Sequence, residues 1–346
     1  MPFCTRWDKG YEITERVCPP CGAPLDSNSE RCVIGMLAMR IAWRAAFVAA
    51  MTALSFPSPT AAGQAAATDH ISPRPDESSI YWNLDRQAGG SRQGILLIAQ
   101  GSGCLAATEN PNITKAKRLL PDFAVVTVEK YGVAAHDAPK DPYEGCSASF
   151  YAHHTVSQRV ADCECVLAEL EHQPWWNGQL VLFGGSEGGA VVSLLAAKVK
   201  PTAVVVFSTA PGRSFAEIFK RTVPAEVAQH FEEELAKMRD NPNSTNVWGG
   251  NSYRWWSDIL HQDMTGALLM TRSPILLVQG DRDTNAPVAV ARGVKDEFER
   301  AGLSNLTYWE LTGFDHAMQD PAGASHLDEV MTRISAWLRD KASKAN

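Results

Sequence analysis

Short apolar runs alternate with longer amphipathic stretches from about residue 70 onward, and this alternation constrains the fold more than any other feature of the sequence. It is typical of parallel strands joined by crossover helices. Several runs are apolar throughout, as expected of strands buried on both faces of a sheet. We expect strands at residues 79–84, 94–100, 123–129, 179–183, 203–208, 275–279 and 306–311, and helices at residues 155–172, 188–199, 287–301 and 326–342. The sequence therefore predicts an α/β fold with a mostly parallel central sheet flanked by helices.

The stretch LVLFGGSEGGAVV joins a predicted strand to a predicted helix through a glycine-rich turn. Gly184, Ser186 and Gly188 satisfy G-x-S-x-G, a sharp turn that exposes a serine hydroxyl above a sheet. Glycine is expected at both positions because the chain approaches itself too closely there for a side chain. A phosphate-binding turn is the alternative, but the lysine of a P-loop and the spacing of a dinucleotide motif are missing. We therefore predict that Ser186 is a nucleophile.

A serine hydroxyl needs a hydrogen-bonded base at neutral pH, and that base needs an acid that fixes its tautomer. Of nine histidines, only His316 lies in a turn between the last predicted strand and the last predicted helix. Asp281 and Asp283 share the polar turn after the strand at residues 275–279, and either could reach the base. We favour Asp283, which lies closer to the helix that follows, and expect Asp281 to be a solvated or capping residue. Three rival histidines lie on or beside an upstream helix and are expected to be surface or packing residues, namely His153, His154 and His172.

Ester or amide cleavage through a tetrahedral intermediate requires hydrogen-bond donors that already point at the developing oxyanion. One donor is expected to be the backbone N–H of Glu187, the residue after the nucleophile, at the start of a helix. The turn QGSGC after the strand at residues 94–100 is expected to supply the second, and we choose the N–H of Ser102. The alternative is that Gly101 and Gly103 merely turn the chain.

These three turns, in the order serine, aspartate, histidine, make the region from about residue 80 to residue 338 resemble the α/β-hydrolase superfamily. The GGSEGG turn is similar to that of prolyl oligopeptidase-type peptidases and dienelactone hydrolase-like esterases. The superfamily often has HG and a small residue where this chain has Gln100 and Gly101, so the oxyanion turn departs from the pattern. The resemblance implies a serine hydrolase with no metal and no organic cofactor.

Residues 214–260 interrupt the alternation of strands and helices. They contain an amphipathic helix at about residues 225–239, a polar loop and an aromatic run, and we expect a helical cap placed over the site. The alternative is a helical excursion that only packs against the sheet. Four aromatic residues of this segment either line an apolar pocket or form the core of the cap, namely Trp248, Tyr253, Trp255 and Trp256.

The N-terminal region has the features of an export signal. Arg40 and Arg44 precede an apolar stretch at residues 45–56, whose length of about 12 residues lies within the usual 7–15 of a signal peptide and below the roughly 20 of a membrane span. We expect residues 36–67 to be a signal peptide and a small-residue spacer, residues 70–346 to be the catalytic domain, and the mature protein to be periplasmic or secreted. An uncleaved membrane anchor is the alternative.

Residues 1–35 form a polar leader that a signal peptide would not normally carry, so we hypothesise that translation begins at Met36 or Met39. The alternative is a zinc module, because the leader contains four cysteines with one CxxC pair, Cys4, Cys18, Cys21 and Cys32. The outer two cysteines lack the paired spacing of a zinc ribbon.

Four further cysteines follow the signal, and in an oxidising compartment they could form up to two bridges. Cys163 and Cys165 point to different faces of a predicted helix and should not pair with each other. We suggest a bridge between Cys104, beside the oxyanion turn, and Cys146, with inert buried thiols as the alternative.

Composition supports a folded enzyme rather than a nucleic-acid binder. The 346 residues are 45% hydrophobic and 21% charged, with a formal net charge of -7, so no broad cationic surface is expected to meet a phosphate backbone. The sequence predicts hydrolysis of a small ester through an acyl-enzyme. An exported peptidase or amide hydrolase is the close rival, and a non-catalytic binding protein on the same fold is the rival of another class. The oligomeric state is left open.

Overall fold

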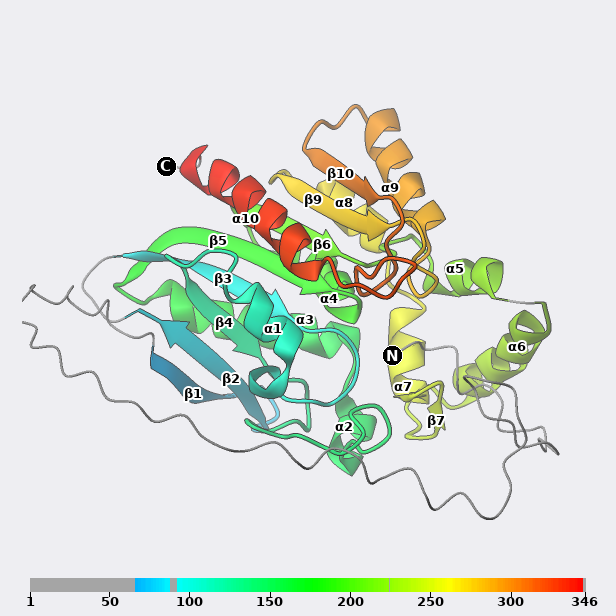
Figure 1. Ribbon diagram of the computed structural model, residues 1–346. Helices are drawn as coiled ribbons and strands as arrows, with labels where there is room; N and C mark the ends of the chain where they lie inside the picture. The colour runs from blue at the N-terminus through cyan, green and yellow to red at the C-terminus, as the bar shows by residue number, and fades with distance from the viewer. Residues whose placement is uncertain (1–65, 88–91, 224, 345–346) are drawn as a thin grey trace, which may run out of the picture. The chain divides into compact units, whose positions relative to one another are not determined.

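The computed structural model describes residues 66–87, 92–223 and 225–344 (Figure 1). The strands are β1 (Ala66–Pro73), β2 (Ser79–Arg86), β3 (Gln93–Ala99), β4 (Ala124–Val128), β5 (Trp176–Gly185), β6 (Ala203–Phe207), β7 (Val247–Trp248), β8 (Asn251–Ser252), β9 (Ile275–Gly280) and β10 (Leu306–Leu311). The helices are η1 (Ala107–Glu109), α1 (Pro111–Ala116), α2 (Ala148–His153), α3 (Val156–Glu171), α4 (Glu187–Ala196), α5 (Phe215–Thr222), α6 (Ala225–Asp240), α7 (Tyr253–Ile259), α8 (Met264–Met270), α9 (Val288–Arg300) and α10 (Leu327–Lys344).

Eight of these strands form one sheet in the order β1-β2-β4-β3-β5-β6-β9-β10. The pairings β1–β2 and β2–β4 are antiparallel, and every pairing from β4 to β10 is parallel. The carboxyl ends of the parallel strands therefore share one edge of the sheet, which is where α/β proteins place their sites.

Helices cover both faces of the sheet, and the alternation of side chains along each strand divides the core between them. On β5, Leu182 points toward the face that packs on α3 and α4, where it joins Val160 and Val191. Its neighbour Phe183 points to the opposite face and belongs to the same cluster as Ile334 of α10. Figure 1 shows α1 and α10 on one side of the sheet and α3 and α4 on the other. The result is the three-layer arrangement expected of an α/β fold.

The predicted mostly parallel sheet with flanking helices is confirmed. All seven expected strands are present, and the four expected crossover helices correspond to α3, α4, α9 and α10. Strand β1 was missed because its sequence, AATDHISP, contains no apolar run, and its first residues are exposed at the edge of the sheet. It begins at Ala66, inside the segment predicted to be a spacer. The short helices α1, α2, α5, α7 and α8 were also missed.

The predicted leader at residues 1–35, the signal peptide and the four leader cysteines lie outside the described residues. Within the described part of the chain, no helix is both long and apolar enough to cross a membrane.

Candidate active site

Ser186 lies between β5 and α4 in a strained backbone conformation. Its φ is 53° and its ψ is -125°, in a region that a non-glycine residue rarely occupies and that costs about 1–3 kcal/mol. Hydrogen bonds to residues at and just after the end of β6 hold Ser186 in this conformation. The Ser186 N–H donates to the Phe207 carbonyl at 3.0 Å, and the Thr209 hydroxyl donates to the Ser186 carbonyl at 2.9 Å. The end of β6 thus fixes the turn on both sides of this residue.

Gly184 and Gly188 make the tight turn sterically possible. A Cβ atom added to Gly184 would lie 2.1 Å from the Gly188 carbonyl oxygen, and one added to Gly188 would lie 1.9 Å from the Ala99 carbonyl oxygen. Both distances are far below van der Waals contact, so any side chain would push the turn away from β3 or open it.

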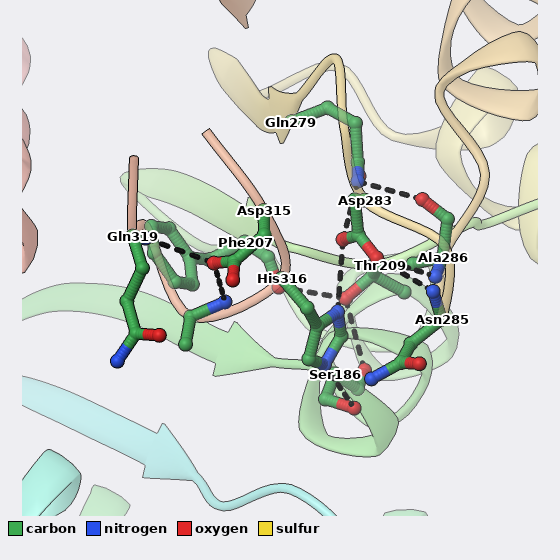
Figure 2. Close-up of polar contacts among 11 residues, drawn as sticks. Ser186, Phe207, Thr209, Gln279, Asp283, Asn285, Ala286, Asp315, His316 and Gln319 are labelled. Carbon is green, nitrogen blue, oxygen red and sulfur yellow. Dashed lines mark hydrogen bonds and ion pairs between the residues drawn. The ribbon is translucent and has the colours of Figure 1, made fainter. Parts of the chain in front are cut away.

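The three predicted side chains lie in series, although they come from three separate turns (Figure 2). The His316 Nε2 atom is 3.2 Å from the Ser186 hydroxyl oxygen, and the His316 Nδ1 atom is 2.8 Å from the Asp283 Oδ2 atom. Each turn follows a strand of the parallel part of the sheet, β5, β9 or β10. This is the geometry in which an imidazole can accept a proton from a hydroxyl while a carboxylate fixes its tautomer.

The Asp283 carboxylate is fully buried and held by several donors. Its Oδ1 atom accepts from the backbone N–H groups of Asn285 and Ala286, each at 2.8 Å. Its Oδ2 atom accepts from the Gln279 side-chain amide at 2.7 Å, beside the contact with His316. Figure 2 shows these donors around the carboxylate. The carboxylate therefore has little freedom to leave the imidazole.

Two nearby aspartates have other partners. Asp281 accepts from the Gly313 N–H at 2.7 Å and so holds the turn after β10. Asp315 accepts from the N–H groups of Ala317 and Gln319, at 2.9 and 2.8 Å, and shapes the loop that carries His316. Among the described contacts, Asp283 is the carboxylate that reaches the imidazole.

The two segments predicted to form the oxyanion hole flank the Ser186 hydroxyl. Glu187 is the first residue of α4, where helix geometry leaves the backbone N–H without an intrahelical partner. The turn after β3 passes beside the nucleophile, since a Cβ on Gly101 would lie 3.4 Å from the Ser186 Cβ. Ser102 is the next residue of this turn. The roles of the Ser102 and Glu187 amides stay predictions.

A buried cluster of charged side chains lies next to these segments, and sequence reasoning missed it. Arg159 of α3 donates from Nη1 to the Glu187 carboxylate at 2.7 Å, and His154 Nε2 lies 3.2 Å from the same oxygen. Lys130 donates to the Gly103 carbonyl at 2.6 Å. His154, expected to be a surface or packing residue, is buried against the Phe150 ring and also belongs to this cluster. The available signal was a charged Glu-Lys pair directly after the apolar strand that became β4.

Burial and mutual contact shift the pKa values of this cluster. Burial raises the pKa of Glu129 to about 7 and lowers the pKa of Lys130 to about 7. Burial also lowers the pKa of His154. Burial would raise the pKa of Glu187, but His154 and Arg159 outweigh it and hold that pKa below its usual range. Glu187 is therefore a buried carboxylate that stays ionised at neutral pH.

The suggested disulfide between Cys104 and Cys146 is present, with a Cα–Cα distance of 5.6 Å. It ties the turn after β3 to the loop before α2, and the Cys104 N–H also donates to the Pro142 carbonyl of that loop at 2.8 Å. Cys163 is buried and Cys165 is exposed, and neither is bonded to the other.

The aromatic residues of the predicted cap pack on one another. Trp248 and Trp255 lie 4.9 and 5.1 Å from Trp256 between ring centroids, and Phe231 lies 5.5 Å from Trp248. Tyr253, Trp255 and Trp256 are buried. Of the two alternatives that the sequence left open, this packing favours a cap core over a pocket lining.

Several solved structures share this arrangement of elements at low sequence identity. Est1E from Butyrivibrio proteoclasticus has a TM-score of 0.55 and is 15% identical over 80% of this chain and 99% of its own. An esterase from Pyrococcus furiosus has a TM-score of 0.53 and is 12% identical over 80% of this chain and 91% of its own. A protein provisionally assigned as a dienelactone hydrolase from Klebsiella pneumoniae has a TM-score of 0.52 and is 14% identical over 80% of this chain and 98% of its own. No family model and no curated protein matches the sequence. The likeness concerns the arrangement of the backbone, and on that ground the chain has the α/β-hydrolase fold.

Proposed function

We propose that the protein is a serine hydrolase that cleaves a small carboxylic ester through a covalent acyl-enzyme. The observation that carries the proposal is the pair of hydrogen bonds at His316, 3.2 Å to the Ser186 hydroxyl and 2.8 Å to the Asp283 carboxylate. A serine is a weak nucleophile unless a base of this kind removes its proton. The strained backbone at Ser186 adds support, because such conformations cluster at functional sites.

In the proposed reaction, the Ser186 hydroxyl oxygen attacks the ester carbonyl carbon while His316 Nε2 takes the hydroxyl proton. The carbonyl oxygen becomes an oxyanion, which the backbone N–H groups of Ser102 and Glu187 stabilise. Asp283 stabilises the imidazolium without taking its proton. The C–O bond of the ester then breaks, and the imidazolium gives its proton to the leaving alcohol.

The acyl-enzyme is released by water in the reverse order of roles. His316 removes a proton from water, the resulting hydroxide attacks the acyl carbonyl, and the Ser186 oxygen leaves with the proton that His316 returns. The product is a free carboxylic acid. The residues named here account for every proton transfer in the cycle.

The names of the similar structures favour an ester over a peptide. The Pyrococcus furiosus structure is named an esterase, a further one from Paleococcus ferrophilus is named a monoacylglycerol lipase, and Est1E has a structure with ferulic acid bound. Their sequence identity to this chain is low, so they support the class of reaction and leave the acid and alcohol parts of the substrate to experiment.

A fluorophosphonate probe tests the proposal, because it reacts covalently with activated serines. We expect the purified protein to be labelled at Ser186, and Ser186→Ala to lose both labelling and ester hydrolysis, with kcat reduced by roughly 10⁴–10⁶-fold. Absence of labelling in a folded wild-type protein would instead favour a non-catalytic binding protein.

A substrate panel separates an esterase from the rival peptidase or amide hydrolase. p-Nitrophenyl acetate and butyrate are compared with p-nitroanilides of single amino acids. We expect a higher kcat/KM for the esters, measured against the Ser186→Ala background. Preference for the anilides would replace the esterase with an amide hydrolase that uses the same residues.

We also propose that the protein is exported and that residues 214–260 act as a cap. Export is supported by the disulfide between Cys104 and Cys146, which persists in oxidising compartments. N-terminal sequencing of the protein recovered from the periplasm or medium tests this. A mature N-terminus between residues 56 and 66 is expected, and one upstream of Met36 would contradict it.

A further inference from the structure

We propose that Arg159 is a positioning residue that holds the two predicted oxyanion amides in register with each other. The inference rests on the proposed function. Arg159 lies on α3, outside the turns that carry the predicted triad, and its side chain is 4% exposed. Its two terminal nitrogens contact the two segments that must cooperate during acyl transfer.

Each nitrogen of the guanidinium has one partner. Nη1 donates to the Glu187 carboxylate at 2.7 Å, and Nη2 donates to the Gln100 carbonyl at 2.7 Å. Glu187 directly follows Ser186, and Gln100 directly precedes the turn that contains Ser102. One rigid planar group therefore joins the start of α4 to the end of β3. Lysine could not form both contacts with the same geometry, because it presents a single point charge.

A second buried basic side chain holds the other end of the same turn. Lys130 is 1% exposed and donates to the Gly103 carbonyl at 2.6 Å. The carbonyls of Gln100 and Gly103 thus bracket Ser102. The peptide group is planar, so fixing a carbonyl also fixes the direction of the N–H across the same bond. The two anchors therefore fix the peptide planes of the Gln100–Gly101 and Gly103–Cys104 bonds, which are the two ends of the short turn that contains Ser102, and so limit where the Ser102 N–H can lie.

Stability alone gives a poor reason for burying these two basic side chains. Taking charges out of water is costly, and apolar side chains of similar volume often stabilise a core as well or better. Arg159 and Lys130 donate to backbone carbonyls of the oxyanion turn and to the residue after the nucleophile. Their partners are thus the segments whose placement decides the rate of the proposed reaction.

The consequence for catalysis is selective. The oxyanion forms only in the transition state, so a displaced amide lowers kcat and leaves substrate binding nearly unchanged. A misplacement of about 1 Å costs on the order of 10²-fold in rate. A residue that served folding alone would change stability without this split between kcat and KM.

The test compares Arg159→Lys with Arg74→Lys. Arg74 is also buried, and two of its nitrogens each donate at 2.8 Å to the carboxylate of Asp162, which lies on α3 like Arg159. Arg74 touches neither oxyanion segment, so it serves as the matched control. We expect Arg159→Lys to lower kcat for p-nitrophenyl acetate by about 10²-fold with KM within about threefold of wild type. Phenylboronic acid forms a tetrahedral adduct with an activated serine. The substitution should raise the Ki of this inhibitor by a similar factor. Arg74→Lys should lower the Tm while kcat stays within about threefold.

Other results overturn the inference. Equal losses of kcat in the two lysine variants, or a wild-type kcat in Arg159→Lys, would reduce Arg159 to a folding role. Should Arg159→Lys fail to fold, Glu187→Gln removes the charge that Arg159 holds and keeps the side-chain shape. It is expected to lower kcat at least about tenfold with KM preserved, and a wild-type kcat there would equally reject the inference.

Labelling of the wild-type protein separates this inference from the proposed function. If the fluorophosphonate probe fails to label Ser186 in the wild type, the proposed function falls and the positioning role falls with it. If the wild type is labelled and hydrolyses esters while Arg159→Lys matches it, the positioning role alone is rejected.

Discussion

The Asp283 carboxylate uses both oxygens, one for two backbone N–H groups and the other for Gln279 and the imidazole. Asp283→Asn keeps the shape but allows the amide to donate to the histidine, which favours the wrong tautomer. We expect kcat to fall about 10⁴-fold, measured on the ester that the wild type hydrolyses best. Asp281→Asn in the same turn is the control, since Asp281 holds the Gly313 N–H, and its kcat should stay within about threefold. A larger loss for Asp281→Asn would transfer the orienting role to Asp281.

Glu129 makes the stability of the folded protein depend on pH. Burial raises its pKa from the ordinary 4.5 to about 7 in the folded protein. A group with a raised folded pKa contributes stability below its unfolded pKa and loses it as the pH rises through the folded value. The stability that Glu129 contributes is therefore lost between about pH 4.5 and pH 7. Lys130, whose pKa burial lowers to about 7, changes its contribution above this window, between pH 7 and its ordinary 10.5.

Glu129→Gln removes the titrating group from this window. We expect the free energy of unfolding, measured by urea denaturation at several pH values, to decline less steeply between pH 4.5 and pH 7 than in the wild type. The variant keeps an oxygen that can accept from the Ala107 N–H, which Glu129 binds at 2.8 Å. An unchanged slope would mean that Glu129 does not titrate there.

The residues of the candidate site divide into those that the sequence predicted and those that it could not. Ser186, Asp283 and His316 were predictable because each lies in a turn directly after an apolar strand, so the topology of a parallel sheet brings them to one edge. Arg159 could not be predicted as part of the site, because a charged residue on an amphipathic helix is normally exposed. Only the packing of α3 beside α4 puts its guanidinium next to Glu187.

At the scale of the elements, the disulfide joins the turn after β3 to the loop before α2 across 42 residues. A cross-link over a loop of this length restricts the unfolded chain, and its removal costs about 3–4 kcal/mol. We expect the double variant Cys104→Ser/Cys146→Ser to lose free energy of unfolding of this size in urea. Cys165→Ser changes an exposed free thiol and should differ from wild type by less than about 0.5 kcal/mol. Equal stability of the double variant would show that the bridge adds nothing to the fold.

Elements with a strong periodic pattern were predicted, and elements shaped by tertiary contacts were not. Strands β3, β6 and β9 and the second half of β5 are almost entirely apolar because helices cover both of their faces. Strand β1 pairs with β2 in antiparallel fashion at the edge of the sheet and needs no such run. Helices α1, α2, α7 and α8 have six or seven residues, too few to establish a helical period in the sequence.

For the molecule as a whole, the sheet and residues 214–260 should differ in local stability. Strands β5 and β6 lie in the middle of the sheet and are covered on both faces, whereas α6 packs mainly on α5 and α7. Because local opening can require far less free energy than global unfolding, amides of α6 should exchange with solvent at least about 10²-fold faster than those of β5. Hydrogen exchange followed by mass spectrometry or NMR measures this. Equal protection would mean that residues 214–260 unfold with the sheet, against their proposal as a separate cap.

The bond between Cys104 and Cys146 also bears on how the protein is produced. A bacterial cytosol keeps thiols reduced, so material made there carries both of these as free thiols beside the exposed Cys165. Oxidation during purification can then couple the exposed Cys165 to a thiol of another molecule before the native bond forms. Two preparations of the same sequence can thus differ in activity and stability solely because one was expressed in a reducing compartment and the other in an oxidising one.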